Sequence, residues 1–155
     1  MWSHEPAGYD CPFCRVATGG ETDLNRRGDV VWRDELTTAF ISPRWWDSNP
    51  AHVIVVPNEH FENLYVVPEP AIAAVYATAK RLAAALMAEY SCDGTSTRQH
   101  NGPGAGQEVW HLHVHVFPRY AGDELYENNK RVRWTQPEER APYARRLRER
   151  LRIRD

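Results

Sequence analysis

Three histidines alternate with apolar residues in the segment His-Leu-His-Val-His, and this alternation restricts the fold more than any other feature of the sequence. Successive side chains of a β-strand point to opposite faces of the sheet. On a strand over residues 109–117, His111, His113 and His115 therefore share one face, and the apolar residues share the other. The apolar face can pack against a helix, and the imidazoles then form a row with spacings of roughly 6–7 Å.

The strongest helix pattern extends from about Pro70 to Tyr90 and supplies such a packing partner. Its apolar side chains recur at the i, i+3, i+4 and i+7 spacing of an amphipathic helix. A proline near the first turn favours a helix start there, and Gly94 is the expected terminator. The apolar positions are Ile72, Val75, Tyr76, Ala79, Leu82, Ala83, Leu86, Met87 and Tyr90.

Short runs rich in β-branched and apolar residues predict the remaining strands, at residues 30–32, 36–41, 52–56 and 95–100. Residues 12–18 predict a short helix. Between Pro43 and Pro50 we expect a loop that exposes Trp45 and Trp46. Two interpretations of this pair remain open, because exposed tryptophans can stack on a nucleobase or can cover a subunit interface.

These patterns predict a single domain over residues 1–155 with an α+β fold, built on a five-stranded, mainly antiparallel sheet with one long helix and a C-terminal helix. Thr135 and Glu138 have capping-box spacing for that last helix, which is expected to end near residue 152. Trp134 and Tyr143 are expected to pack against it.

The charge pattern indicates neither nucleic acid nor a membrane as a partner, because the formal net charge is only −2. Glutamates interrupt the arginine-rich C-terminal segment, which favours a solvated helix face over a polyanion-binding patch. No apolar run of roughly 18 residues and no signal-peptide pattern is found, so a cytoplasmic protein is expected. The arginines are Arg145, Arg146, Arg148, Arg150, Arg152 and Arg154.

A glycine-rich loop at residues 102–107 directly precedes the histidine strand. Backbone N–H groups of glycines can approach an anion closely, and Gln107 adds side-chain donors. An imidazole is mostly neutral near pH 7 and is a competent nucleophile at phosphorus. The loop and the imidazole row together predict phosphoryl or nucleotidyl transfer.

Metal binding offers two further interpretations of the sequence. Three zinc ligands on one strand are disfavoured, because His111 and His115 lie too far apart for a single ion unless the strand bends. Cys11 and Cys14 have the Cys-x-x-Cys spacing of a metal or redox pair. No second Cys-x-x-C motif is present, so further metal ligands would have to come from distant histidines.

Residues 100–119 resemble the signature of the histidine triad (HIT) family, in which Gly-Gln precedes three alternating histidines. Cys11-Pro-Phe-Cys14, Ala39-Phe40 and residues 52–64 match the family in the same order. The resemblance covers about residues 9–120 and leaves 121–155 outside it as a C-terminal tail.

The resemblance implies an α+β fold, a homodimer and no organic cofactor. It also implies cleavage of nucleoside phosphoramidates or dinucleoside polyphosphates through a nucleotidyl-histidine intermediate. His113 matches the nucleophile and His115 the histidine that contacts the reacting phosphate. Gly106 and Gln107 match phosphate-contacting positions, and His52 matches a further histidine near the nucleophile. The alternative is a nucleotide-binding sensor or adaptor with little turnover.

The resemblance also implies a structural zinc ion, because zinc-bearing relatives combine such a cysteine pair with two histidines. The matching positions here are His60 and His111, which would join Cys11 and Cys14.

Three positions depart from the family pattern and leave the natural substrate open. His100 replaces an asparagine or glutamine that helps hold phosphate, and Ser42 stands where an acidic residue often binds the ribose. Glu108 replaces a serine or threonine that assists the leaving group. A carboxylate there repels phosphate, so we expect Glu108 either to point away or to be protonated.

Overall fold

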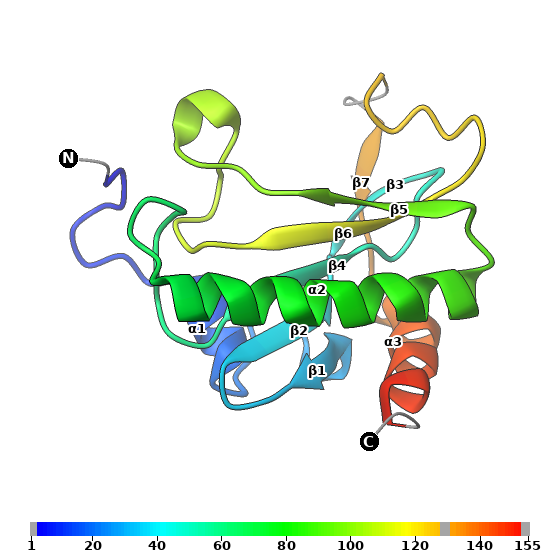
Figure 1. The fold of residues 1–155 in the computed structure, drawn as a ribbon, viewed down its shortest axis with the longest axis horizontal. Coiled ribbons are helices and arrows are strands. Elements are labelled where there is room, and N and C mark those ends of the chain that lie inside the picture. The colour runs from blue at the N-terminus through cyan, green and yellow to red at the C-terminus, as the bar shows by residue number, and fades with distance from the viewer. Residues whose placement is uncertain (1–2, 128–130, 153–155) are drawn as a thin grey trace.

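The computed structural model describes residues 3–127 and 131–152, and its centre is a five-stranded antiparallel sheet (Figure 1). Every neighbouring pair of strands in this sheet is antiparallel. Along the sheet the order is β1 (Val30–Arg33), β2 (Thr37–Ile41), β4 (Val53–Pro57), β6 (Val114–Arg119) and β5 (Gly94–Arg98). The α+β architecture with a long helix and a C-terminal helix is confirmed.

Helix α2 (Glu69–Tyr90) lies along one face of the sheet (Figure 1). Its buried side packs against alternate residues of the central strands, which include Val53, Val55, Val114 and Val116. The residues between them point to the opposite face, where Phe40, Ile54 and Val56 pack against helix α1 (Pro12–Ala17). Both faces of the middle of the sheet are therefore covered, and the strands carry long apolar runs.

The end of α2 differs from the expectation. The cap residue is Ser91, whose positive φ of 51° gives the left-handed conformation that ends the helix. Gly94 instead begins β5, three residues later.

Among the described residues, α2 is also the one helix that is long and apolar enough to cross a membrane by length and composition. The expectation that no run of roughly 18 apolar residues occurs is not contradicted, because Lys80 and Arg81 interrupt this helix. The finding is weak evidence for a membrane, because the core helix of a soluble protein meets the same criterion.

Residues 43–50 do not form the expected loop. Strand β3 (Arg44–Trp46) pairs with β7 (Val132–Trp134) from the C-terminal tail, so the described part of the chain has a second, two-stranded sheet. Trp45 and Trp46 are buried, and the expectation that they are exposed is wrong. Trp45 packs edge-on against Tyr143 of α3 (Pro137–Arg152), at 5.4 Å between ring centroids.

The histidine strand is shorter than expected, because β6 begins only at Val114. Before β6 the backbone bonds are irregular: the N–H of Leu112 donates to the carbonyl of Phe61, and the N–H of His111 donates to the nearby carbonyl of Val109. The side-chain alternation nevertheless continues through this irregular stretch. Leu112 is buried with Val114 and Val116 in the core that contains α2.

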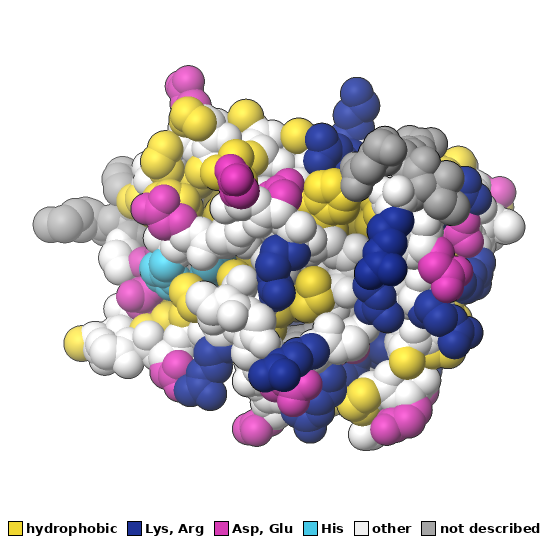
Figure 2. Space-filling model, turned by 90° about the horizontal axis from the view of Figure 1, so that it is seen from below, with side chains coloured by type: hydrophobic (Ala, Val, Ile, Leu, Met, Phe, Trp, Pro, Cys, Tyr) yellow, Lys and Arg dark blue, Asp and Glu magenta, His cyan; other side chains and the backbone are white. Residues whose placement is uncertain are grey.

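Helix α3 ends at Arg152, as expected, but its start is capped differently. The carboxylate of Glu139 accepts the backbone N–H of Gln136, and Thr135 bonds the carbonyl of Pro43 instead. Basic side chains gather at the end of the molecule where α3 lies (Figure 2). Within the described residues this agrees with a solvated face, since Arg145 and Arg146 are exposed. Arg154 lies outside the described residues.

One arginine of α3 is buried and holds the C-terminal helix to the rest of the protein. The guanidinium of Arg140 binds both carboxylate oxygens of Asp29, at 2.8 and 3.0 Å, and both side chains are almost fully buried. It also donates to the carbonyl of Thr135 at 2.6 Å. Asp29 lies in the turn η1 (Arg27–Asp29), so this ion pair joins the tail to the segment before β1.

We expect Arg140→Ala to lower the free energy of unfolding by about 3–5 kcal/mol, because it leaves the carboxylate of Asp29 buried without its cation. Urea denaturation followed by circular dichroism measures this change. Arg145→Ala, an exposed residue of the same helix, is the control and is expected to change stability by less than about 0.5 kcal/mol. Equal effects of the two substitutions would contradict the role given to Arg140.

Candidate functional site

A cleft of about 530 Å³ opens on the sheet face that α2 does not cover. Ile54 and His115, which are paired across β4 and β6, form part of its floor. Trp46 and Trp134 from the two-stranded sheet form another part of its lining. The predicted site residues that line the cleft are His52, His100, His113, His115, Gly106, Glu108 and Ser42.

His113 is held in one orientation inside the cleft. Its Nδ1 lies 2.7 Å from the backbone carbonyl of His111, and a carbonyl can only accept, so Nδ1 carries the proton. The ring nitrogen Nε2 is then unprotonated and available to a bound ligand. The edge contact with Phe13, at 5.1 Å between ring centroids, fixes the plane of the imidazole. Burial lowers the pKa of His113, which favours this neutral form.

His115 and His52 form a hydrogen-bonded pair beside His113. Nδ1 of His115 lies 3.1 Å from Nε2 of His52, and the ring of His52 stacks on Phe117 at 4.3 Å. Burial, together with the positive charges of Arg98 and Arg44, lowers the pKa of His52 to about 3. Burial also lowers the pKa of His115 well below its usual value. Both rings are therefore neutral near pH 7.

The surroundings of His52 decide which ring of this pair donates. Nδ1 of His52 is buried and has no partner among the described residues. An unpaired buried acceptor is tolerated better than an unpaired buried donor, so the proton of His52 sits on Nε2 and is donated to His115. His115 then carries its own proton on Nε2, where it can be donated into the cleft.

The side chain of Gln107 stabilises the glycine-rich loop through three hydrogen bonds to backbone groups. The side chain of Gln107 accepts the N–H of Gly102 at 2.8 Å and donates to the carbonyls of Glu62 and Val109 at 2.6 and 3.0 Å. The backbone N–H groups of Gly106 and Gln107 donate to carbonyls of Pro103 and Gly102. Gln107 therefore holds the loop closed and does not line the cleft, in contrast to the phosphate contact that the resemblance implies.

Gly106 has a structural reason to be glycine. Its φ of +83° lies in the left-handed region, and a Cβ there would lie 3.2 Å from Nδ1 of His100. This close approach lets the imidazole of His100 reach the cleft past the loop. The N–H of Glu108, the next amide after those of Gly106 and Gln107, has no acceptor among the described residues and remains available to an anion.

The carboxylate of Glu108 is largely exposed and has a cationic partner, which the sequence did not predict. It lines the cleft and binds Nη1 of Arg44 through both oxygens, at 2.9 and 3.2 Å. This ion pair compensates the negative charge that would otherwise repel a phosphate. Ser42 supports Arg44 from behind, because its hydroxyl donates to the carbonyl of Arg44 and accepts its N–H.

The cleft residues that the set predicted from sequence lacks include two arginines and a tryptophan: Arg44, Arg98 and Trp134. Arg98 and His100 are two residues apart on the same predicted strand, so their side chains are expected to point to the same face. This spacing could have identified Arg98 as a cleft residue. Trp134 was expected only to pack the terminal helix. Its exposed ring instead lies at the cleft, and the guanidinium of Arg44 lies 5.8 Å from the ring centre. The pairing of β7 with β3 places it there, and this pairing cannot be predicted from the sequence around Trp134.

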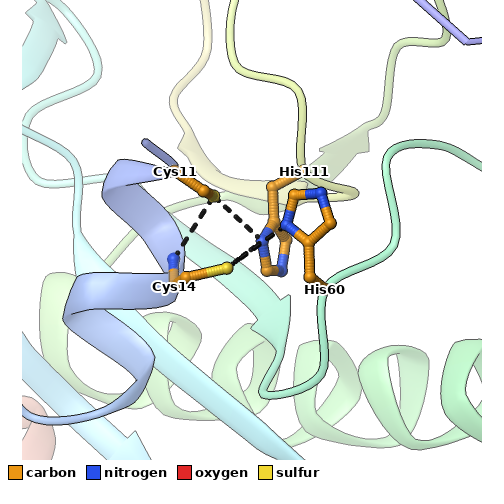
Figure 3. Close-up of side chains that lie close together, drawn as sticks. All are labelled: Cys11, Cys14, His60 and His111. Carbon is orange, nitrogen blue, oxygen red and sulfur yellow. Dashed lines mark hydrogen bonds between the residues drawn. The ribbon is translucent and has the colours of Figure 1, made fainter. Parts of the chain in front are cut away.

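A second cluster lies next to the cleft and consists of Cys11, Cys14, His60 and His111 (Figure 3). Their side chains point toward one another from α1, from the loop after β4 and from the segment before β6, and their ligand atoms all lie within 4.8 Å of one another. The shortest approaches are 3.3 Å between Cys11 Sγ and Nδ1 of His111, and 3.2 Å between Cys14 Sγ and Nδ1 of His60.

The far ring nitrogens of this cluster have partners of their own. Nε2 of His111 donates to the carbonyl of Pro57 at 3.0 Å, and Nε2 of His60 lies 2.6 Å from the carboxylate of Glu5. Both bonds direct the Nδ1 lone pairs toward the two sulfur atoms. Two thiolates and two oriented imidazoles fit a tetrahedral metal ion such as zinc.

Comparison with known proteins agrees with this geometry. The family model of the HIT domain matches residues 24–122. An uncharacterised HIT-like protein of Methanocaldococcus jannaschii is 35% identical over 115 residues, which cover 73% of this chain and 81% of that protein. The chain therefore belongs to the histidine triad family.

Two further relatives have informative descriptions. Adenylylsulfatase HINT3 of Arabidopsis thaliana is 26% identical over 120 residues, 76% of this chain and 56% of that protein. The crystal structure of a zinc-bound histidine triad family protein from Mycobacterium smegmatis superposes with a TM-score of 0.75 at 27% identity, covering 93% of this chain and 94% of that one. The family thus includes a nucleotide hydrolase and a zinc-bound member.

The buried, neutral His52 predicts a pH-dependent stability. Because its pKa is lower in the folded than in the unfolded protein, its contribution is fully present above about pH 6.5 and is lost as the pH falls toward 3. We expect His52→Gln to flatten the decline of the unfolding free energy between pH 6.5 and 5 by up to about 1.4 kcal/mol per pH unit. Urea denaturation of both proteins measures the two slopes, and identical slopes would contradict the buried, neutral state of His52.

Proposed function

We propose that this protein is a nucleotide hydrolase or transferase that cleaves a P–N or P–O–P bond at the α-phosphate through a nucleotidyl-His113 intermediate. The observation that carries the proposal is the fixed tautomer of His113, whose Nδ1 is bound to a carbonyl while Nε2 is left for the ligand. The relationship to an adenylylsulfatase supports a nucleotide substrate.

In the first step, the lone pair of Nε2 attacks the α-phosphorus, and the bond to the leaving group breaks as the P–N bond forms. The ring of His113 then carries a positive charge, which the carbonyl of His111 stabilises through Nδ1–H. In the second step, water attacks the phosphorus and loses a proton to solvent, the electron pair of the broken P–N bond returns to Nε2 of His113, and the nucleoside monophosphate leaves.

Two donors of the cleft are placed to stabilise charge on the non-bridging oxygens. One is Nε2–H of His115, whose direction follows from its bond to His52. The other is the free backbone N–H of Glu108, which takes the part that the resemblance gives to the amides of Gly106 and Gln107. His100 lies at the same end of the cleft and serves as a further phosphate contact.

A nucleotide-binding sensor or adaptor would use the same cleft without turnover. The enzyme is favoured because binding alone requires donors, whereas the orientation of His113 leaves an unprotonated nitrogen. Incubation with adenosine phosphoramidate and with diadenosine tetraphosphate, followed by product analysis, separates the two functions.

We expect His113→Ala to lower turnover of the cleaved nucleotide by at least about 100-fold, the lower end of the range for such catalytic groups. His4→Ala, an exposed histidine outside the cleft, is the control. Circular dichroism and melting show whether both variants keep their fold. Retention of more than about a hundredth of wild-type activity by His113→Ala would exclude it as the nucleophile.

We further propose that Cys11, Cys14, His60 and His111 hold one structural zinc ion per chain, which would fix α1 to the segment before β6. The fit of the donor set and the zinc-bound relative support this assignment. Because the carbonyl of His111 orients His113, an ion at this cluster would also hold the nucleophile in place.

Elemental analysis is expected to find one zinc per chain. Cys11→Ser should lower both the zinc content and the melting temperature, because it removes one of four ligands. Cys92→Ser is the matched control, since Cys92 is also a free, buried cysteine but lies outside the cluster. A metal-free wild-type protein whose melting is unchanged by a chelator would exclude the zinc site.

The assembly and the location of the protein stay predictions. Among the strands that the structure describes, β5 pairs with β6 alone, so its outer edge can pair with a second copy in a homodimer. Tyr76 and Met87 expose apolar surface on α2 that such an interface would cover. The three cysteines are free, as in a reducing cytoplasm.

A further inference from the structure

Arg98 lines the cleft but has no part in the mechanism described above. It is the last residue of β5 and pairs in register with His115 of β6. Its guanidinium lies 5.0 Å from the ring centre of Trp46 and 4.9 Å from that of Phe117. The guanidinium of Arg98 therefore lies beside the histidine row of the cleft and stacks on two aromatic rings.

The charge of Arg98 is not compensated within the described residues. Arg98 forms no ion pair there, and its Nε is buried without an acceptor. Among the described arginines that stack on an aromatic ring, four have a carboxylate partner: Arg44 with Glu108, Arg119 with Asp123, Arg133 with Glu139 and Arg146 with Glu89. Arg81, which stacks on Trp32 and has no ion pair among the described residues, is exposed to solvent, whereas Arg98 is half-buried. A partly buried guanidinium without an anion is unfavourable, so this position suits a ligand that supplies the anion.

The rest of the cleft supplies no counter-charge either. Its charged lining residues are Arg44, Arg98 and Glu108, and the ion pair between Arg44 and Glu108 cancels two of these charges. One positive charge remains in the cleft, although the whole chain has a formal net charge of −2. The neighbouring imidazoles of His52 and His115 are neutral and do not change this balance.

We propose that Arg98 forms a second anion subsite that binds the leaving group. The substrate is then a nucleotide whose leaving group carries a phosphate or a comparable anion, rather than a phosphoramidate that releases an amine. This inference rests on the proposed function and selects between the two bond types that the proposed function allows.

The arrangement of the rings gives the second phosphate a place. The rings of His113 and His115 are 5.1 Å apart, and those of His115 and Phe117, on which Arg98 lies, are 5.7 Å apart. A reacting phosphate at the first pair thus leaves the adjoining phosphate directed along the row toward the guanidinium. The planar guanidinium can bind two phosphate oxygens at once.

This position is also where negative charge develops during the reaction. As the P–N bond to His113 forms, the bridging P–O bond breaks, and its electron pair stays on the oxygen of the leaving phosphate. Arg98 stabilises that charge, which an amine leaving group does not develop. Arg98 therefore determines which leaving groups are favoured, whereas the attack by His113 is common to all substrates.

Binding of AMP and ADP to His113→Ala protein, measured by isothermal titration calorimetry, tests the subsite without turnover. We expect ADP to bind more tightly than AMP by at least about tenfold, the effect of charge-assisted hydrogen bonds to one more phosphate. Adding Arg98→Gln should bring the two affinities close together, and Arg98→Lys should retain part of the difference. Arg81→Gln is the matched control, because Arg81 stacks on Trp32 at 5.0 Å but does not line the cleft.

The kinetic counterpart uses two substrates and the active enzyme. Arg98→Gln should lower kcat/KM for diadenosine tetraphosphate at least about tenfold more than kcat/KM for adenosine phosphoramidate. An equal loss for both substrates, or a preference for ADP that survives Arg98→Gln, would overturn the subsite and leave Arg98 as a packing residue. If the wild-type protein binds and cleaves no nucleotide at all, the proposed function itself fails, and the subsite fails with it.

Discussion

The packing of Leu112, Val114 and Val116 against α2 is the constraint on which the rest of the structure depends. All three side chains are fully buried in the main core, so the strand cannot rotate or shift by one residue without exposing them. The alternate side chains are consequently fixed on the opposite face, where His113 and His115 line the cleft. An apolar core on one side of a strand thus determines the position of the reactive groups on the other.

The same short segment also joins the two sites of the molecule. The imidazole of His111 belongs to the cysteine–histidine cluster, and its backbone carbonyl binds Nδ1 of His113 in the cleft. A small displacement of His111 would therefore change the geometry of both sites at once. The irregular backbone before β6 allows this double use, because a regular strand would direct that carbonyl to a neighbouring strand.

The part of the fold that could be predicted from the sequence is the part determined by local periodicity: the long helix, the strands of the main sheet and the histidine row. The pairing of β3 with β7 could not be predicted, because three-residue strands carry little pattern and their partners lie far apart in the sequence. The same limit applies to Gln107 and Glu108. Their residue types indicated phosphate chemistry, but their roles depend on Gly102 and Arg44, whose positions only the folded chain defines.

The two-stranded sheet and the buried ion pair of Arg140 with Asp29 connect residues outside the family match to the cleft and the core. The HIT match spans residues 24–122, yet Cys11 and Cys14 precede it and Trp134 follows it. A fragment trimmed to the matched residues would keep the histidines but would have neither cysteine of the cluster nor the tryptophan beside Arg44. Relatives that share the triad but differ in these flanking segments would therefore have binding clefts of different shape around the same nucleophile.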